Sequence, residues 1–453
     1  MPDWLRTPIA PRHGALRQRE PHQLVAPLIR ALLDRNGLPA AAVDAVILGN
    51  ALGAGGNPAR LGALAAGLPD RCQALSIDTQ CCAGLDAIRL GAGLIQARQA
   101  GIVIAGGVEA WSRAPIRQRR PRSPLEAPVS YERPPFTPWP ERDPEPAEAA
   151  ARYAERHGWT RMQQDEYARQ AHQRAVIWHA QAGDGRRHHI LPMDGLWHDA
   201  YPRALSAGLM RRLPIQQTAR DRAGNDCSLS LLAISPEADG AAVVLLASPE
   251  VCRRYDVQAR ACWVDGLSLG VDPSNPMLGA QLAADALLTR HQLSASRLAS
   301  VELHDAFALQ GLALEQALGL APGQLNPHGG GLARGHPIGA SGAIALVDLL
   351  ERLERLDKPG YGEKSDRMTP DTGHTPAEAR LGLACIAAAG GLGAAALVSA
   401  NWPSARACYA HQTRRYSAQK MPLSCSASSS AGTGVMASHI STSLPSTTRH
   451  SSK

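Results

Sequence analysis

Short apolar runs alternate with longer segments of helical periodicity along most of this 453-residue chain. The short runs predict strands at residues 45–48, 102–105, 241–246, 301–304 and 394–399, and the longer segments predict helices at 24–36, 82–97, 162–181, 276–288, 309–318 and 340–356. Strands that alternate with helices are joined by crossover connections, which favour parallel pairing and place helices on both faces of a sheet. We therefore predict an α/β fold with a mainly parallel sheet.

The order of strand, helix, strand and glycine-rich bend occurs twice, with residues 106–107 and 390–391 at comparable places. Such repetition predicts a duplicated core. The stretch 113–235, rich in arginine, proline and tryptophan, predicts a loop domain inserted into the first half. The predicted parts are 1–112 (first part of the N-terminal half), 113–235 (inserted loop domain), 236–256 (last strand of that half), 257–403 (C-terminal half) and 404–453 (tail).

The formal net charge of +7 comes mostly from the tail. Residues 404–453 contain six arginines and lysines, no acidic residue, and many serines. A segment so poor in apolar residues predicts disorder. The rest of the chain is nearly neutral, so we expect no nucleic-acid partner.

The chain has no run of 18 consecutive apolar residues, and its first residues lack the apolar stretch of a secretory signal. These observations predict a soluble cytoplasmic protein without a membrane partner.

Cys81 is the first candidate for chemistry, because it precedes a helix whose apolar face includes Leu85 and Ile88. With Thr79 as the N-cap, Cys81 and Cys82 would lie in the first turn. Free backbone N–H groups and the helix dipole favour a thiolate there, and the same amides could hold an oxyanion. The alternative is that both cysteines are small buried apolar residues.

Three further candidates lie near glycine-rich or strand-end positions. His336, in the stretch 326–342, is either a general base or a structural loop histidine. His304 ends a predicted strand, where α/β proteins usually place their sites. Cys385 precedes the glycine-rich turn 390–393. No Cys-x-x-Cys or His-x-x-x-His pair occurs among these residues, so we expect no metal site.

These blocks, in this order, resemble the thiolase family, which comprises acetyl-CoA acetyltransferases and 3-ketoacyl-CoA thiolases. The resemblance covers about residues 5–400 and rests on blocks at 6–9, 56–60, 79–88, 105–112, 223–225, 239–242, 304–307, 335–337 and 390–393. It implies a duplicated α/β core of five layers, α-β-α-β-α, with mixed sheets and an inserted loop domain.

The resemblance also implies roles for the candidate residues. Cys81 would accept the acyl group, and His336 would take the proton of its thiol. His304 stands where sterol-carrier-type thiolases have a histidine followed by aspartate, and it would hold a water or donate to the thioester oxygen. Cys385 would be the base of the second half-reaction.

The implied partners are acyl-CoA and CoA, which act as substrates, so no cofactor is expected. Asn225, Gly391 and Arg117 would contact CoA. The family resemblance further implies a homodimer or homotetramer.

One departure from the family pattern affects Cys385. The expected cysteine falls on Ala387, two residues later, which keeps Cys385 on the same strand face but moves it by roughly 6.6 Å. A bulge could restore its position.

Three functions therefore remain open. The first is an active thiolase-type acyltransferase that thiolyses 3-ketoacyl-CoA or condenses acetyl-CoA. The second is a catalytically impaired, acyl-CoA-binding or complex-assembly protein. The third is a decarboxylating condensing enzyme that uses Cys81, His304 and His336.

Overall fold

The computed structural model describes residues 1–53, 55–181, 188–356 and 380–400. The predicted disordered tail, 404–453, lies outside these ranges. Among the described residues, no helix combines the length and the apolar character needed to cross a membrane.

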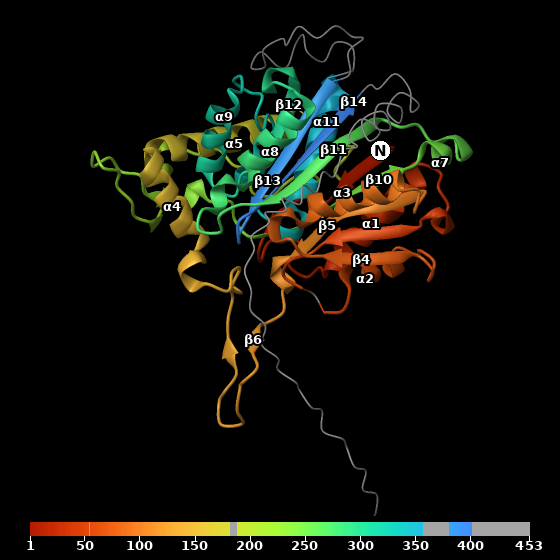
Figure 1. The fold of residues 1–453 in the computed structure, drawn as a ribbon, viewed down its shortest axis with the longest axis horizontal. Coiled ribbons are helices and arrows are strands. Elements are labelled where there is room, and N and C mark those ends of the chain that lie inside the picture. The colour runs from red at the N-terminus through yellow and green to blue at the C-terminus, as the bar shows by residue number, and fades with distance from the viewer. Residues whose placement is uncertain (54, 182–187, 357–379, 401–453) are drawn as a thin grey trace, which may run out of the picture. The chain divides into compact units, whose positions relative to one another are not determined.

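The strands and helices predicted from the sequence are confirmed, with boundaries that differ by a few residues (Figure 1). Within the described ranges, the main strands are β1 (Asp3–Arg6), β3 (Ala45–Gly49), β4 (Gln73–Ile77), β5 (Ile102–Ala110), β10 (Ala238–Ala247), β11 (Ala261–Gly270), β12 (Leu298–His304), β13 (Arg380–Ala388) and β14 (Leu392–Ala400). The helices are α1 (Pro21–Arg35), α2 (Pro58–Ala65), α3 (Ala83–Gln96), α4 (Pro146–His157), α5 (Arg161–Ala180), α6 (Ala207–Met210), α7 (Pro249–Arg254), α8 (Gly279–His291), α9 (Ala308–Leu318), α10 (Gly330–Arg334) and α11 (Ser341–Leu356).

The two large sheets are mixed, so the prediction of a mainly parallel sheet was wrong. The first sheet has the order β1-β10-β5-β3-β4, and the second has the order β11-β14-β13-β12. Parallel pairing is restricted to β3 with β4 and β5, and to β12 with β13. In each sheet the last strand of the half, β10 or β14, runs antiparallel to its neighbours. The prediction missed this because a short apolar run indicates a strand but not the direction in which the strand runs.

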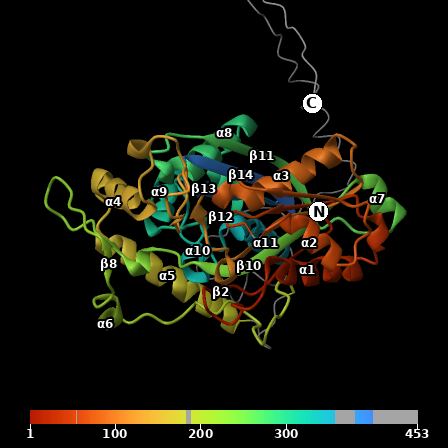
Figure 2. The ribbon, with the colours of Figure 1, turned by 90° about the horizontal axis from the view of Figure 1, so that it is seen from below.

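Both sheets are covered on both faces, which gives the five layers that the resemblance implied. Helices α1 and α2 pack on the outer face of the first sheet, through a cluster that includes Leu28 and Ile104. Helices α3 and α11 lie between the two sheets, where Ile88 and Val347 belong to one shared cluster. Helix α8 covers the outer face of the second sheet, around Leu287 (Figures 1 and 2). The order of layers is therefore α-β-α-β-α.

The two halves repeat one topology. In each sheet the first strand of the half lies beside the last strand, and the two middle strands follow: β1-β10-β5-β3 in one and β11-β14-β13-β12 in the other. The first sheet has two strands more: β4 at its edge, and the short β2 (Ala10–Pro11), which pairs with β10. The repeat places α3 and α11 back to back, so the start of one helix lies near the start of the other.

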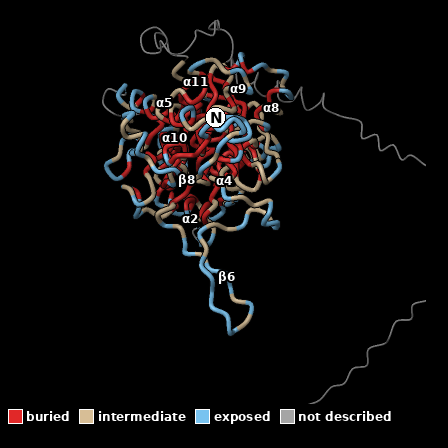
Figure 3. Tube along the Cα trace, turned by 90° about the vertical axis from the view of Figure 1, so that its left-hand side faces the viewer, coloured by how far each residue is buried: buried red, intermediate tan, exposed pale blue. Residues whose placement is uncertain are grey.

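The segment between β5 and β10 carries helices α4 and α5 and two small hairpins. The hairpin of β6 (Gln118–Arg119) and β7 (Val129–Ser130) projects away from the layers and is exposed, while β8 (Ile215–Gln217) pairs with β9 (Leu229–Ser230) (Figures 1 and 3). Helix α5 packs against α9 and α10 through a cluster that includes Ala171 and Leu332. The boundaries proposed for this inserted domain and for the two halves stay predictions.

A network of buried charges ties these parts together around Asp348 on α11. Its carboxylate accepts from Arg6 Nε at 2.8 Å, from Arg334 and from His189 Nε2 at 3.2 Å. Arg6 also reaches Asp199 at 2.7 Å. Since these residues come from β1, the inserted segment, α10 and α11, one carboxylate joins four separate stretches of the chain.

The network determines the charge states of its members. Burial disfavours the ionised carboxyl of Asp348, but Arg6 and Arg334 outweigh it and hold its pKa well below the usual range. His189 lies between Asp348 and Glu351, with Nδ1 3.5 Å from Glu351. Burial lowers the pKa of His189, and the two carboxylates raise it by more, so the net shift is upward.

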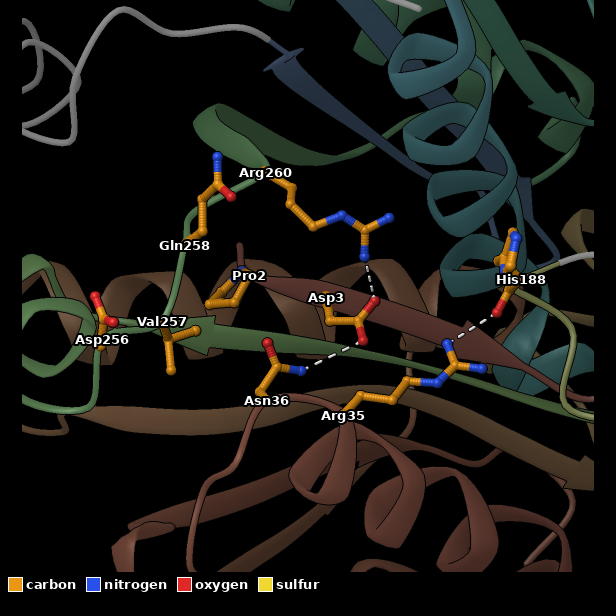
Figure 4. A pocket seen from close by; sticks show the side chains of 9 residues that line it. All are labelled: Pro2, Asp3, Arg35, Asn36, His188, Asp256, Val257, Gln258 and Arg260. Atoms are coloured by element: carbon orange, nitrogen blue, oxygen red, sulfur yellow. Dashed lines mark hydrogen bonds and ion pairs between the residues drawn. The ribbon is translucent and has the colours of Figure 1, made fainter.

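A hollow of about 500 Å³ lies at the start of β1 and is lined by residues such as Asp3, Asn36 and Arg260 (Figure 4). Two of its charged groups are already paired, because Asp3 accepts from Arg260 at 2.6 Å; Asp3 also accepts from Asn36 at 3.3 Å. The pairing of Asp3 with Leu245 places this hollow at the opposite end of the first sheet from residues 238–240.

The network predicts the effect of removing its central charge. Asp348→Asn leaves Arg6, Arg334 and His189 buried without their shared anion, so we expect a loss of about 3–5 kcal/mol in the free energy of unfolding, measured by urea denaturation. The control Arg19→Gln breaks a half-exposed pair with Asp194 and should cost less than about 1 kcal/mol. Equal losses in the two variants would contradict this account.

The raised pKa of His189 predicts a pH dependence. A group whose pKa is higher in the folded state stabilises the fold fully below its unfolded pKa, about 6.5, and loses that contribution as the pH rises through the folded value. His189→Gln should therefore destabilise the protein more at about pH 6 than at about pH 9. The urea midpoints of wild type and His189→Gln, measured between these two pH values, give the loss of stability at each pH. A loss that does not change with pH would refute a charged His189.

Candidate active site

Cys81 and His336 meet between the two sheets. The Sγ atom of Cys81 lies 3.2 Å from Nε2 of His336, although the residues are 255 positions apart in sequence. Cys81 belongs to a 3₁₀ turn, Gln80–Cys82, that leads into α3, and His336 follows α10. His336 also precedes the turn that leads into α11. The duplicated topology brings the start of α3 and the start of α11 together.

Thr79 does not cap the helix as predicted. Its hydroxyl donates to Asp86 Oδ2 at 2.7 Å, and α3 begins at Ala83, after the turn. Cys81 therefore lies just before the helix. The backbone N–H groups of Ala389 and of Cys81 itself favour the thiolate form of this sulfur by lowering its pKa.

The position before α3 does not by itself give Cys81 a low pKa. Burial raises the pKa of Cys81 to about 12, against the opposing effect of the two N–H donors. Burial also lowers the pKa of His336 to about 4. Both shifts have the same cause, since a water-poor site disfavours either charge. The resting pair is therefore a neutral thiol beside a neutral imidazole.

His336 is held from several directions. Its backbone N–H donates to Pro236 O at 2.7 Å, and its carbonyl accepts from Trp111 Nε1 at 3.0 Å. The Nδ1 atom lies 2.7 Å from the hydroxyl oxygen of Ser341. The ring is thus fixed with Nε2 toward Cys81.

His304 stacks on His336, with ring centroids 4.2 Å apart and planes inclined by 28°. Burial and the nearby His336 and Arg334 hold the pKa of His304 well below its usual range, so this imidazole is neutral too. Its Nε2 is buried without a hydrogen-bond partner among the described residues. A β-carbon at Gly331 would come within 2.6 Å of the His304 ring, so only glycine allows α10 to pack there.

Asp305 fixes the helix that carries the chain to His336. Its Oδ1 atom accepts from the backbone N–H groups of Gly331 and Leu332, and its Oδ2 accepts from Tyr167 at 3.1 Å. Asp305 thereby connects the end of β12 to α10 and to α5. Its role is to position the histidines.

Glu109, at the end of β5, fixes the other side of the site. Its carboxylate accepts from Ala51 N at 2.8 Å, Gly339 N at 2.9 Å and Asn50 Nδ2 at 2.7 Å. A β-carbon at Gly107 would lie 2.1 Å from the carbonyl oxygen of Gly339, which explains a glycine here. The loop after His336 therefore packs directly on the first sheet.

Cys385 is not brought to this pair. It pairs with Leu303 and Ala395. The register shift between β12 and β13 lies at Leu298/Ser300, at the other end of the strand, so no bulge between residues 382 and 388 restores the position of Cys385. Its side chain lies in the apolar cluster under α8, and burial raises its pKa. Ala389, which contacts the Cys81 sulfur, is four residues further on, roughly 13 Å along an extended chain.

The three predicted CoA contacts lie in different surroundings. Arg117 donates to Leu52 O at 2.6 Å and to Glu132 O at 3.2 Å, so part of its guanidinium holds two loops together. Asn225 is exposed in a turn, where it donates to Asp221. Gly391, at φ +75°, turns between β13 and β14. Their contact with CoA stays a prediction.

Several residues of the site were not predicted. Ser341 had one usable signal, since serine before an apolar periodic segment suggests a helix start. Trp111 and Glu109 stand in the motif block 105–112 but were assigned no role, and Ala389 had no signal, because each reaches the site through a contact distant in sequence. Across the described ranges, no group of three or more His, Cys, Asp or Glu side chains is placed to hold a metal ion.

Two protein-family models match the chain. The thiolase N-terminal domain matches residues 3–250, and the thiolase C-terminal domain matches residues 257–364. Together the two matches extend over most of the sequence.

Curated relatives agree with these matches. A putative acetyl-CoA C-acetyltransferase VraB from Staphylococcus haemolyticus is 35% identical over 352 residues, which cover 76% of this chain and 90% of the relative. The protein of the same name from Staphylococcus aureus is 34% identical over 361 residues, covering 77% and 92%.

Solved structures share the fold. The Acat5 thiolase from Ascaris suum in complex with coenzyme A superposes with a TM-score of 0.74 at 28% identity, covering 88% of this chain and 98% of that one. The Bacillus anthracis acetyl-CoA acetyltransferase gives 0.74 at 30% identity, with the same coverage. Sequence, fold and the juxtaposition of Cys81 with His336 thus agree, and the chain belongs to the thiolase family.

Proposed function

We propose that Cys81 carries the acyl group in this thiolase-type acyltransferase and that His336 activates it. The observation that carries the proposal is the 3.2 Å contact between Sγ of Cys81 and Nε2 of His336. A part-buried neutral pair at this distance can exchange a proton without moving either backbone.

In the proposed first half-reaction, Nε2 of His336 takes the thiol proton as the sulfur attacks the carbonyl carbon of an acyl-CoA. The carbon–sulfur bond to CoA then breaks, and the leaving CoA thiolate receives that proton from His336. The products are an acyl thioester on Cys81 and free CoA. The negative charge of the sulfur passes to the carbonyl oxygen of the substrate as the bond forms, so no isolated thiolate has to persist. This suits a site that disfavours isolated ions.

The oxyanion of the acyl group needs donors close to the sulfur. The backbone N–H groups of Ala389 and Cys81 favour negative charge at Sγ, which supports them as donors to an oxygen on the carbon bonded to it. In the proposed mechanism His304 serves the acceptor substrate, either by holding a water or by donating to the thioester oxygen.

A second candidate, an impaired acyl-CoA-binding protein, is favoured by one observation. Cys385, nominated as the base of the second half-reaction, is packed in the apolar layer under α8. If another group does not replace it, acylation of Cys81 would occur without carbon–carbon bond cleavage or formation. Acyl-CoA and CoA are partners in both candidates. CoA contact through Asn225, Gly391 and Arg117, and a cytoplasmic location, remain parts of the proposal.

The proposal includes a homo-oligomer, because β4 is an exposed edge strand of the first sheet. Its outer backbone edge can pair with a second copy once Ala74 O gives up the hydrogen bond that it accepts from Asn57 Nδ2 at 3.0 Å. Leucines on β4 and on the neighbouring α2 are more than 40% exposed: Leu61, Leu64 and Leu75. A dimer that pairs two β4 strands would cover these side chains.

The acyl-enzyme is tested with purified protein, acetoacetyl-CoA and CoA. Wild type should form acetyl-CoA and show an acetyl adduct on Cys81 by mass spectrometry. Cys81→Ala should lose the adduct and at least about a thousandfold in turnover, because it removes the nucleophile. Cys82→Ala, a neighbouring buried thiol that contacts Ile386 O, is the matched control and should keep both.

The same assay separates the two candidates. Turnover that survives Cys385→Ala supports the acyltransferase without that cysteine. An adduct on Cys81 without acetyl-CoA formation from acetoacetyl-CoA would support the impaired protein, and an adduct on another residue would refute both.

The oligomer is tested by Leu75→Lys, which places a charge on the exposed edge strand. We expect a shift toward the monomer mass in light scattering after size exclusion, because pairing would bury that charge. Val129→Lys, on the exposed β7, is the control and should leave the mass unchanged. A monomeric wild type would refute the proposed dimer.

A further inference from the structure

We propose that Ser341 is a positioning residue that holds His336 in the tautomer with its proton on Nδ1, leaving the lone pair of Nε2 toward the sulfur of Cys81. The inference rests on the proposed function and extends it, because it names the group that makes His336 a base. It follows from the hydrogen-bond donors and acceptors at three successive contacts: Cys81 with His336, His336 with Ser341, and Ser341 with Pro337.

The count begins at the sulfur. The Sγ atom of Cys81 carries a proton at rest, because burial raises the pKa of this thiol. The thiol proton therefore needs an acceptor, and Nε2 of His336 is 3.2 Å away. An Nε2 that accepts carries no proton, so the neutral ring must carry its proton on Nδ1.

The count ends at the serine. Its side chain is fully buried, and its hydroxyl donates to the carbonyl of Pro337 at 3.0 Å. A hydroxyl has one proton, so at the 2.7 Å contact with His336 the oxygen accepts and Nδ1–H donates. All donors then point the same way, from Cys81 through His336 and Ser341 to Pro337.

Local folding places the serine where this is possible. Pro337 begins a tight turn, Ile338–Ala340, in which Ala340 N donates to Pro337 O at 2.8 Å. Ser341 is the first residue of α11, so its side chain returns toward Pro337 and the imidazole. A five-residue separation thus becomes direct contact.

The surroundings of His336 contain no competing acceptor for Nδ1–H among the described contacts. His304, stacked 4.2 Å away, is neutral, and the carboxylates of Glu109 and Asp305 accept from backbone N–H groups of other segments, including Ala51 and Gly331. The partner of Nδ1 is therefore a neutral hydroxyl. It orients the ring without stabilising a permanent imidazolium, in keeping with the lowered pKa of His336.

The test compares Ser341→Ala with Ser341→Thr, which keeps the hydroxyl. We expect Ser341→Ala to lower kcat by about 10- to 100-fold while KM for acyl-CoA changes less than about twofold, and Ser341→Thr to recover most of the loss. The rate of Cys81 alkylation by iodoacetamide should also fall in Ser341→Ala, and its pH profile should move to higher pH. Ser399→Ala is the matched control, because this buried serine on β14 has no hydrogen-bond partner among the described residues and should change none of these values.

A folded Ser341→Ala protein with the wild-type alkylation profile would overturn the inference. Should that variant not fold, ¹⁵N-histidine NMR of wild type reads the tautomer directly, with the His336 signals assigned by their loss in His336→Gln. A protonated Nδ1 beside an unprotonated Nε2 supports the proposal, and the reverse overturns it. Alkylation and NMR need no acyl-CoA, so failure of the proposed acyl transfer remains distinguishable from failure of this inference.

Discussion

Four separate stretches of the chain meet at the carboxylate of Asp348, on α11. It lies in the middle layer and binds Arg6 from the first sheet, His189 from the inserted segment and Arg334 from α10. Each partner is buried, so each charge would be costly without the others. The network therefore specifies how the two halves and the inserted segment meet.

The same network leads to the catalytic candidates. Arg334 is the last residue of α10, and His336 follows it after one glycine. Asp305 holds the beginning of that helix, while Glu109 holds the loop after His336. The 3.2 Å contact with Cys81 is thus the result of three buried carboxylates, none of which touches the sulfur.

Burial has opposite consequences for structure and chemistry. In the Asp348 network, opposite charges are close enough to remain ionised despite desolvation. At Cys81 and His336 no permanent counter-charge is present among the described contacts, so burial makes both groups neutral. Because the resting pair is neutral, the thiolate forms only when the sulfur attacks the substrate. In the proposed mechanism, the N–H groups of Ala389 and Cys81 then stabilise the developing negative charge.

The sequence by itself determined the α/β class, the strands and helices with their approximate ends, and the family, because apolar periodicity and the ordered motif blocks are local properties of the chain. It also selected Cys81, His304 and His336, which stand in such blocks. Tertiary structure decided what these patterns do not encode: the antiparallel direction of β10 and β14, the burial that keeps Cys81 protonated, the packing of Cys385 under α8, and the contacts of Trp111, Glu109 and Ala389. Strand direction, dielectric environment and long-range contacts arise only when distant segments pack together, so a linear pattern cannot specify them.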